Sequence, residues 1–254
     1  MIQLTPTQLA GLRSWFPADQ PGPQIGLHII NTGNGACFAD RWPDPRAVLA
    51  DSAGNYFLSG EPDLLTPSDL QGRVSGFIEA HEQFFPLLQA TFPDLKVWQR
   101  VILDLEGEPA FVLPREYTVR ALGLADVHHL WGLNPDLAWI ARTWGGPTGL
   151  ASSGHAWGAF TGNKLVSVAC SFFVGDAYED IGVVTESAFR GQGLSAACAG
   201  TLCEEIQSRG RRPSWTTSPD NTASIRVAEK LGFVTQRRDR LYITKQEIPR
   251  PAYR

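Results

Sequence analysis

The C-terminal half of the chain has the clearest pattern of hydrophobic and polar positions. Short apolar runs bounded by turn residues predict three strands, at 156–161, 164–174 and 181–185. The first two are joined by Gly162-Asn163, a dipeptide typical of a hairpin turn. Apolar positions then recur every three or four residues, which predicts a helix. In order, the pattern predicts a helix over 193–208, a strand over 213–217, a helix over 221–231 and a strand over 241–246.

The N-terminal part has a weaker pattern of the same kind. Runs bounded by Gly, Pro, Asn or Asp predict short strands at 35–40, 47–50, 55–59, 96–105 and 110–113. Helical spacing predicts a helix over Thr5–Phe16 and a long one over Ser68–Phe92, with Ser68 as its N-cap and Pro93 as its stop. Between them, Pro21-Gly22-Pro23 interrupts any regular element.

The two parts are expected to meet near residue 114. A strand over 117–122 and a short helix over 125–132 restart the pattern, and a stretch rich in Trp, Gly and Pro (134–154) predicts irregular structure. We therefore predict an α/β protein with a mixed sheet, divided into a smaller domain (1–114) and a larger one (115–254). The order of elements in the first is compatible with a degenerate copy of the second.

Composition excludes several classes of protein. With 254 residues, 43% hydrophobic and 19% charged, the chain is an ordinary globular protein of one or two domains. Its longest apolar stretch, Leu165–Val174, is much shorter than the roughly 20 residues of a membrane helix. The N-terminus lacks the basic-then-apolar order of a signal peptide. We expect a cytoplasmic protein without membrane contact; the sequence leaves a homodimer open.

Cysteine spacing gives no sign of a metal site. Cys37, Cys170, Cys198 and Cys203 form no CxxC pair, and no histidine lies at a zinc-ligand spacing from them. We expect no metal and reduced, mostly buried thiols.

The net charge of −4 conceals an uneven distribution. Residues 181–254 hold 12 Lys and Arg against 7 Asp and Glu, a balance of +5, whereas residues 1–180 hold 10 against 19, a balance of −9. A nucleic-acid-binding domain is usually basic overall. A small polyanionic ligand near the C-terminal third agrees better with this distribution, and we expect no nucleic-acid partner.

The hexapeptide Arg190-Gly191-Gln192-Gly193-Leu194-Ser195 lies between a predicted strand and a predicted helix. Two glycines allow a close approach of the backbone to a ligand, and the helix N-terminus adds partial positive charge, which suits a pyrophosphate. A purely structural turn is one alternative. A dinucleotide-binding loop is another, but only 61 residues follow Gly193, too few for the long parallel sheet of that fold.

Further motifs favour a third interpretation. Val183-Val184-Thr185, Arg190-x-x-Gly193-x-Ser195, Asn221-x-x-Ser224 and Glu229-Lys230-Leu231-Gly232-Phe233 occur in this order. Together they resemble the GNAT superfamily of N-acetyltransferases, over roughly residues 117–244. The resemblance implies binding of acetyl-CoA as acyl donor. It also implies that residues 183–185 contact the pantetheine arm and that residues 190–195 bind the pyrophosphate.

Two later residues are further candidates for contact with the donor. By resemblance, Asn221 contacts the pantetheine region and Ser224 is a weaker binding candidate. Asn221 could equally be the N-cap of the following helix, because Pro219-Asp220-Asn221-Thr222 is a strong helix-start signal.

The reaction implied by the resemblance is transfer of an acetyl group to a primary amine of a small molecule or amino-acid-like acceptor. A general base is then needed to deprotonate the incoming ammonium. Glu179 and Asp180 are the candidates, since Glu179 resembles in position the catalytic Glu of the histone-acetylating branch. The alternatives are that both are turn carboxylates, or that His155 is the base.

One departure from the family leaves a second class of function open. Many members have a Tyr, thought to reprotonate the departing thiolate, where this chain has Ala228. A water or Ser224 could replace it, or the thiolate could leave unaided. Alternatively, the protein is a non-catalytic acyl-CoA-binding sensor or scaffold.

Overall fold

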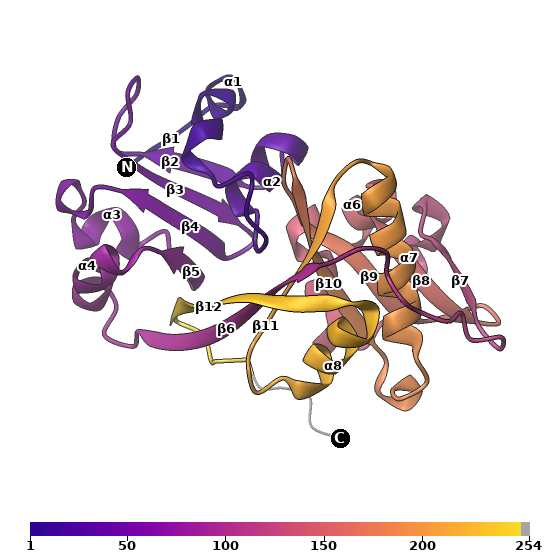
Figure 1. Cartoon of the computed structure of the whole chain (residues 1–254). Helices are drawn as coiled ribbons and strands as arrows, with labels where there is room; N and C mark the ends of the chain where they lie inside the picture. Colours follow the sequence, from indigo (N-terminus) through magenta and orange to yellow (C-terminus); the bar gives the residue numbers. More distant parts are fainter. Residues whose placement is uncertain (250–254) are drawn as a thin grey trace.

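One sheet of twelve strands runs through the computed structural model, which describes residues 1–249 (Figure 1). The strands are β1 (Ile2–Gln3), β2 (Ala36–Ala39), β3 (Ala47–Ser52), β4 (Asn55–Gly60), β5 (Gly76–Ala80), β6 (Lys96–Leu105), β7 (Thr118–Ala121), β8 (Ala156–Thr161), β9 (Lys164–Val174), β10 (Tyr178–Thr185), β11 (Arg212–Thr217) and β12 (Phe233–Thr244). Their spatial order is β1-β2-β3-β4-β5-β12-β6-β11-β10-β9-β8-β7.

The helices are short apart from two in the C-terminal half. The α-helices are α1 (Pro6–Leu9), α2 (Ile25–Thr32), α3 (Pro67–Gln71), α4 (Phe85–Thr91), α5 (Val127–Trp131), α6 (Pro147–Ser152), α7 (Leu194–Ser208) and α8 (Thr222–Leu231). The 3₁₀ helices are η1 (Ala10–Trp15), η2 (Pro62–Leu64), η3 (Glu82–Phe84), η4 (Leu124–Asp126), η5 (Pro135–Trp144) and η6 (Ser187–Phe189). None of the helices described is long and apolar enough to cross a membrane.

The two halves repeat one order of elements. In the N-terminal half, β2, β3 and β4 are antiparallel, β4 pairs in parallel with β5, and α4 and β6 follow. In the C-terminal half, β8, β9 and β10 are antiparallel, β10 pairs in parallel with β11, and α8 and β12 follow. This repetition supports the interpretation of the first half as a copy of the second.

The last strand of each half is inserted into the other half. β6 lies between β11 and β12, and β12 lies between β5 and β6, so the sheet is continuous across both lobes. Figure 1 shows these two long strands crossing from one lobe to the other. The boundary near residue 114 stays a prediction, and the last five residues of the range 115–254 lie outside the described part.

Helices cover both faces of the sheet. In the C-terminal half, α7 and α8 pack on one face against Trp215 and Leu103, and η5 and α6 pack on the other face against Val168 and Val184. In the N-terminal half, α3 and α4 pack on one face of β3 to β5, and α2 packs on the other, where it also meets Phe173 of β9. Asp180 and Glu179 therefore lie on a strand that is covered from both sides.

The long helix predicted over 68–92 is wrong. The segment instead forms α3, β5 and α4, and the N-cap of α3 is Thr66 rather than Ser68. Gly76 interrupts it with φ +141°, and a Cβ there would lie 2.2 Å from the Gly54 carbonyl oxygen. Gly76 therefore begins β5 with its backbone close to the start of β4. The apolar residues before Gly76 are buried from α3, and those after it are buried from β5 and α4.

Other elements also differ from the expectations. The last strand, predicted over 241–246, is β12 and begins at Phe233 and ends at Thr244. The predicted strand 110–113 is irregular, and Ala110 N donates to Leu231 O. The predicted helix 5–16 is α1 followed by η1. Helix α2 over Ile25–Thr32 has no counterpart in the predictions, because its residues are mostly buried on all sides and give little helical periodicity.

Candidate active site

Strands β10 and β11 begin as neighbours and then part. They pair in parallel register from Tyr178 and Arg212 to Ile181 and Trp215. Beyond that point β10 still pairs with β9, and β11 still pairs with β6. Within the described residues, no backbone pairing joins the edges of β10 and β11 that face each other. A gap therefore opens between the two strands toward Thr185. Unpaired strand edges of this kind offer backbone groups to an extended, peptide-like ligand.

Alternate residues of β10 direct their backbone groups into this gap. Glu186 N donates to Val166 O at 2.9 Å, which fixes the antiparallel pattern between β10 and β9. In that pattern Val184 bonds to β9, whereas the N–H and C=O groups of Val183 and Thr185 point away from β9. Of the three residues expected at the pantetheine arm, Val183 and Thr185 have suitably directed backbone groups. Val184 instead contributes its side chain to the core under η5.

The loop before α7 has open space beside its glycines. Gly191 and Gly193 have φ of +77° and +80°, and a Cβ on either would meet no atom within 4 Å. Their backbone conformation, rather than crowding, calls for glycine. Ala197 N donates to Gly193 O, so the N–H groups of residues 194–196 have no partner in the helix. Together with the helix dipole they form a site for an anion.

The side chains of the loop have defined positions. Arg190 Nε lies 3.4 Å from Thr185 O, at the open end of the gap. Tyr117 donates its hydroxyl hydrogen to Gln192 Oε1. The side chain of Leu194 is buried in the core beneath α7, so only its backbone N–H could contact a ligand.

Ser195 is bonded to the neighbouring strand. Its Oγ lies 2.8 Å from Thr185 Oγ1, which lies 2.7 Å from Ser167 Oγ. Ser167 in turn donates to Val184 O at 2.8 Å. This chain of hydroxyls attaches the start of α7 to β10 and β9. The hydroxyl of Ser195 therefore positions the loop, and its direct contact with a pyrophosphate stays a prediction.

Asn221 is the N-cap of α8, one of the two roles that the sequence left open. Its Oδ1 accepts from Ser224 N at 3.3 Å. Ser224 Oγ accepts from Trp215 Nε1 at 2.9 Å. Ala228 is fully buried against α7 and supplies no hydroxyl.

Glu179 lies inside an ion cluster. Arg209 Nη2 and Arg211 Nη1 each lie 3.0 Å from its carboxylate, His155 Nδ1 lies 3.2 Å away, and Ser171 donates a hydrogen bond. Burial alone would raise the pKa of Glu179, but the bonds from His155, Ser171 and Arg209 hold it at about 2. A fully buried carboxylate of this acidity is a poor base, and His155 is occupied in the same cluster.

Asp180 has the opposite character. Ser214 and Thr216 both donate to its Oδ1, at 3.0 and 2.9 Å. No donor among residues 1–249 reaches Oδ2, and the residue as a whole is buried, with 4% of its surface exposed. Burial raises the pKa of Asp180 to about 7 even though these two hydroxyls lower it.

The position of Asp180 also suits a base. It lies opposite Ser214, one residue before the end of the parallel pairing, and a bulge separates it from Ile181. A carboxylate with one free oxygen and a pKa near neutrality therefore lies where the gap between β10 and β11 closes.

Sequence reasoning missed the partners of both carboxylates. Ser214 and Thr216 alternate in β11, a spacing of two that places both on one face of a strand. Arg209 and Arg211 follow the last turn of α7 and are brought to Glu179 by the return of the chain into β11. Pairing these residues with Glu179 and Asp180 requires the strand register, which the sequence does not supply.

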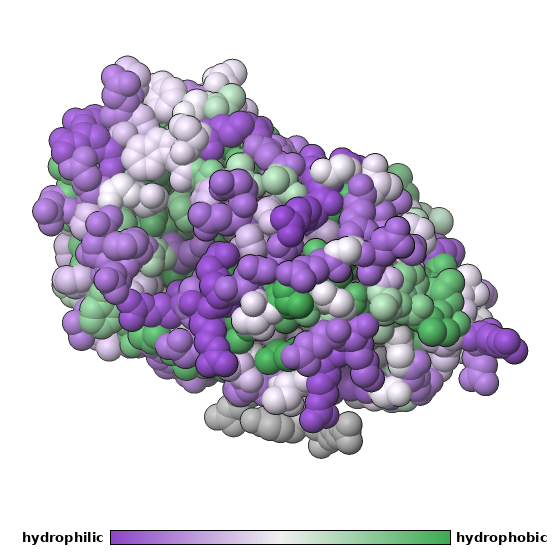
Figure 2. All heavy atoms as spheres, viewed as in Figure 1, coloured by the Kyte–Doolittle hydropathy of each residue, from purple (hydrophilic) through white to green (hydrophobic). Residues whose placement is uncertain are grey.

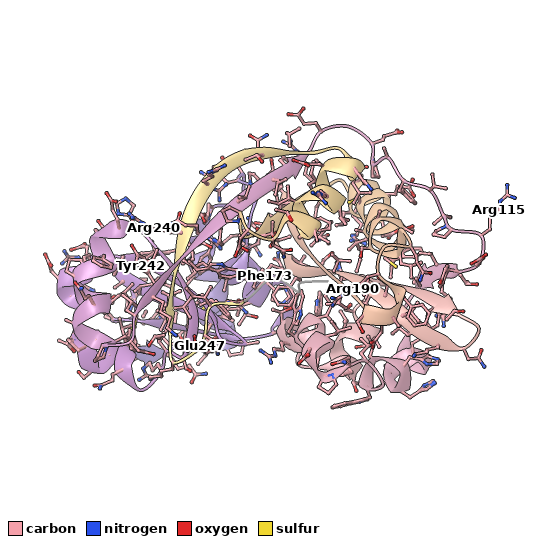
Figure 3. All side chains as sticks on the ribbon, turned by 90° about the horizontal axis from the view of Figure 1, so that it is seen from below. Arg115, Phe173, Arg190, Arg240, Tyr242 and Glu247 are labelled. Atoms are coloured by element: carbon pink, nitrogen blue, oxygen red, sulfur yellow. The ribbon has the colours of Figure 1, made fainter. Side chains whose placement is uncertain are left out.

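The positive charge of the last third is spread over the molecule. Figure 3 shows Arg190 in one lobe and Arg240 in the other, with Phe173 between them. Three arginines of this third pair with buried carboxylates: Arg209, Arg211 and Arg212. Three more lie on β12 beside the N-terminal half: Arg237, Arg238 and Arg240. The excess of positive charge in residues 181–254 is therefore not concentrated around the glycine loop.

The cysteines and the acidic side chains show no metal site. All four cysteines are buried and unpaired with one another. No group of three or more His, Cys, Asp or Glu side chains suited to a metal ion occurs in the part of the chain that the structure describes.

The fold is that of GCN5-related N-acetyltransferases. A crystal structure of a GCN5-related N-acetyltransferase-like protein from Streptococcus suis 89/1591 superposes with a TM-score of 0.69 at 19% identity, over 93% of this chain and 98% of the other. A tandem GNAT protein from the clavulanic acid biosynthesis pathway superposes with a TM-score of 0.58 at 12% identity, over 98% and 99% of the two chains.

The sequence comparisons then define the family. The family model of the GNAT acetyltransferases matches residues 19–242, so the chain belongs to the GNAT acetyltransferase family. An uncharacterized N-acetyltransferase of Streptomyces virginiae is 38% identical over 213 residues, 82% of this chain and 90% of that protein. The uncharacterized N-acetyltransferase YdfB of Bacillus subtilis (strain 168) is 25% identical, over 92% and 94% of the two chains. The family and the two-part organisation expected from the sequence are confirmed.

Proposed function

We propose that this member of the family transfers the acetyl group of acetyl-CoA directly to a primary amine of a small or amino-acid-like acceptor. The observation that carries the proposal is the gap between β10 and β11, which leads from the glycine loop to the free oxygen of Asp180. A long donor with a phosphorylated end and a reactive end matches these two features.

In this proposal the donor is bound mainly by backbone groups. The N–H groups at the start of α7, with Gly191 and Gly193 allowing close approach, hold the pyrophosphate. Arg190 adds a positive charge beside it. The pantetheine amides pair with Val183 and Thr185 at the open edge of β10, as a peptide adds to a sheet.

The reaction then needs a base and a site for negative charge. Asp180 Oδ2 accepts a proton from the acceptor ammonium, and the free amine attacks the thioester carbonyl carbon. A backbone N–H of the open edge of β10 stabilises the oxyanion that forms. The C–S bond breaks and CoA leaves as a thiolate; the acetylated nitrogen loses its second proton to water, which passes a proton to the thiolate, so the products are the amide and the CoA thiol. Ala228 in place of a tyrosine makes water the simplest proton donor for this step.

The buried Ala228 also motivates the alternative, a non-catalytic acyl-CoA-binding sensor. Such a protein would keep the loop and the gap but have no use for a titratable Asp180. Both functions use a donor made inside the cell, and we place the protein in the cytoplasm on that ground.

One experiment separates the two functions. Acetyl-CoA is titrated into the purified protein by calorimetry, and release of the CoA thiol is followed with a panel of primary amines. Saturable binding with thiol release above the amine-free rate supports the enzyme. Saturable binding without release from any amine supports the sensor, and no binding by the folded protein contradicts both.

A further inference from the structure

The carboxylate of Asp180 lies on the face of the sheet opposite α7. Its partners Ser214 and Thr216 alternate along β11 with Trp215, whose side chain is buried beneath α7 and α8. Gly182, two residues after Asp180 in β10, lies on the same face as Asp180. An acceptor that gives its proton to Asp180 therefore contacts side chains of this face.

A bulge in β9 places an extra phenylalanine beside this part of β10. Phe173 is the register partner of Asp180 and Ser171 that of the next residue, so Phe172 lies between them without a partner. Thr143 of η5 donates to Phe172 O at 2.7 Å and holds the bulge in place. The side chain of Phe172 packs against the apolar clusters beneath η5 and around α2, which lie on the face opposite α7. The bulge thus turns an aromatic ring toward the face of the base.

Phe172 lies directly against the strand that carries the base. A Cβ on Gly182 would lie 3.3 Å from Phe172 Cβ and 3.0 Å from Ile140 Cδ1. Trp139, the neighbour of Ile140 in η5, packs edge-on against the Phe172 ring, with 5.5 Å between the ring centroids. Because two residues of a strand span about 7 Å, this aromatic pair begins roughly that far from Asp180 along β10.

The burial of these residues distinguishes the pair from the base. Phe172 and Trp139 are half-buried, whereas Phe173 is 3% exposed, so part of the surface of the pair remains open to contact with another molecule. Asp180 is 4% exposed, so an amine at its carboxylate is held among side chains rather than in water. Polar groups next to that amine would lose their hydration without a replacement. An apolar group in that place gains from burial.

We propose that the acceptor is a primary amine that carries an aromatic ring, and that the ring packs against Phe172 and Trp139 while the ammonium group reaches Asp180. The inference rests on the proposed function and names its class of acceptor. Since two residues of β10 separate the pair from the base, a linker of a few carbons between ring and amine has the required length. Aromatic rings prefer the edge-on and offset contacts that such a pair offers. Figure 2 shows hydrophilic residues gathered where β12 passes between the lobes, so the pair differs in character from that surface.

Matched acceptors test the aromatic contact. Phenylalkylamines with linkers of two to four carbons are compared with n-alkylamines of the same linker by thiol release. The wild type is expected to give a kcat/KM for the best phenylalkylamine at least roughly 10-fold above that for its n-alkylamine, because the ring is buried on binding. Equal values for every pair would overturn this inference, although transfer to both amines would still support the proposed function.

Two variants assign the contact. Phe172→Ala and Trp139→Ala are each expected to raise the KM of the phenylalkylamine by about 5- to 10-fold. The KM of the n-alkylamine and the acetyl-CoA Kd should stay within about 2-fold of wild type, because neither ligand needs the rings. Comparing each variant with wild type cancels the difference in basicity between the two amines. If Phe172→Ala does not fold, Trp139→Ala tests the same contact from η5.

A second aromatic pair supplies the control. Trp98 is also half-buried and packs against Phe77, with 5.9 Å between the ring centroids, but this pair lies on β6 and β5, beside the N-terminal half. Trp98→Ala should therefore keep the wild-type preference for the phenylalkylamine. A preference that survives in the folded variants of the Phe172–Trp139 pair contradicts the assignment, and so does an equal loss in Trp98→Ala.

Direct binding keeps this test separate from that of the proposed function. If no amine releases thiol, binding of the phenylalkylamines and n-alkylamines is measured by calorimetry in the presence of CoA, on the wild type and on the three variants. Phenylalkylamine binding that is weakened in Phe172→Ala and Trp139→Ala but kept in Trp98→Ala supports the aromatic contact even if the catalytic proposal fails. Absence of binding by every phenylalkylamine overturns it.

Discussion

Glu179 and Asp180 are consecutive residues of β10 whose carboxylates lie on opposite faces of the sheet, with pKa values shifted in opposite directions. Glu179 is bound by Arg209 and Arg211 and has a pKa of about 2. Asp180 is bound only by hydroxyls and has a pKa of about 7. β10 therefore holds one carboxylate that stays ionised at neutral pH and one that titrates near pH 7. The first suits an ion cluster, and the second suits a general base.

Replacing Asp180 by Asn is expected to lower kcat/KM by roughly 100-fold or more, because the variant cannot accept a proton from the acceptor. Acetyl-CoA binding should stay within about 2-fold. In the wild type, kcat/KM should rise with pH to a plateau, with a midpoint near 7, as Asp180 loses its proton. The variant should lack this midpoint. Thiol release between pH 5 and 9 measures both, and a wild-type midpoint retained in Asp180→Asn excludes this residue as the base.

Replacing Glu179 by Gln is expected to affect stability first. The variant leaves Arg209 and Arg211 without their buried partner, which costs on the order of 3 kcal/mol at pH 7. The pKa of Glu179 is lowered from 4.5 to about 2, so its contribution is present above pH 4.5 and is lost as pH falls toward 2. Urea unfolding should therefore show a difference from wild type that narrows between pH 7 and pH 3. The midpoint near pH 7 in kcat/KM should persist in the folded variant. Its loss would instead make Glu179 the base.

Local patterns predicted much of the fold, and non-local register accounts for the rest. β6 and β9 have the bounds that alternation predicts, and α7 and α8 begin within a residue of the expected position. No local pattern indicates that β6 is inserted between β11 and β12, because that exchange is decided by contacts more than 100 residues apart. For the same reason, the sequence identified Glu179 and Asp180 together but could not tell which one Arg209 would neutralise.

Replacing Gly193 by Asp is expected to weaken acetyl-CoA binding by at least about 10-fold. The residue has φ +80° at the start of α7, and a carboxylate there opposes the phosphates of the donor. Gly162→Asp is the control, since Gly162 also has positive φ and open space but lies in the β8–β9 hairpin. Calorimetry with acetyl-CoA should find the control unchanged. Equal weakening in both variants would assign the effect to backbone strain rather than to the loop.

Replacing Ser195 by Ala separates positioning from ligand binding. Loss of the bond to Thr185 should lower the free energy of unfolding by about 1 kcal/mol, and the acetyl-CoA Kd should change by less than about 3-fold. In a Thr185→Val background the same change should cost almost nothing in stability, because the partner is already absent. A large loss of acetyl-CoA affinity with unchanged stability would show that the hydroxyl contacts the donor directly.

The raised pKa of Asp180 also predicts that removing its charge stabilises the protein. The pKa rises from an ordinary 3.8 to about 7, so the folded state holds a proton that the unfolded chain releases. The resulting penalty is absent below pH 3.8, grows between pH 3.8 and 7, and is complete above pH 7. Asn keeps the acceptor oxygen for Ser214 and Thr216 but carries no charge. Asp180→Asn should therefore be more stable than wild type by roughly 2 to 4 kcal/mol at pH 8 and nearly equal at pH 4. Urea unfolding at the two pH values measures the difference. A variant that is less stable at pH 8 would mean that Asp180 is a structural anion, and the case for it as the base would be lost.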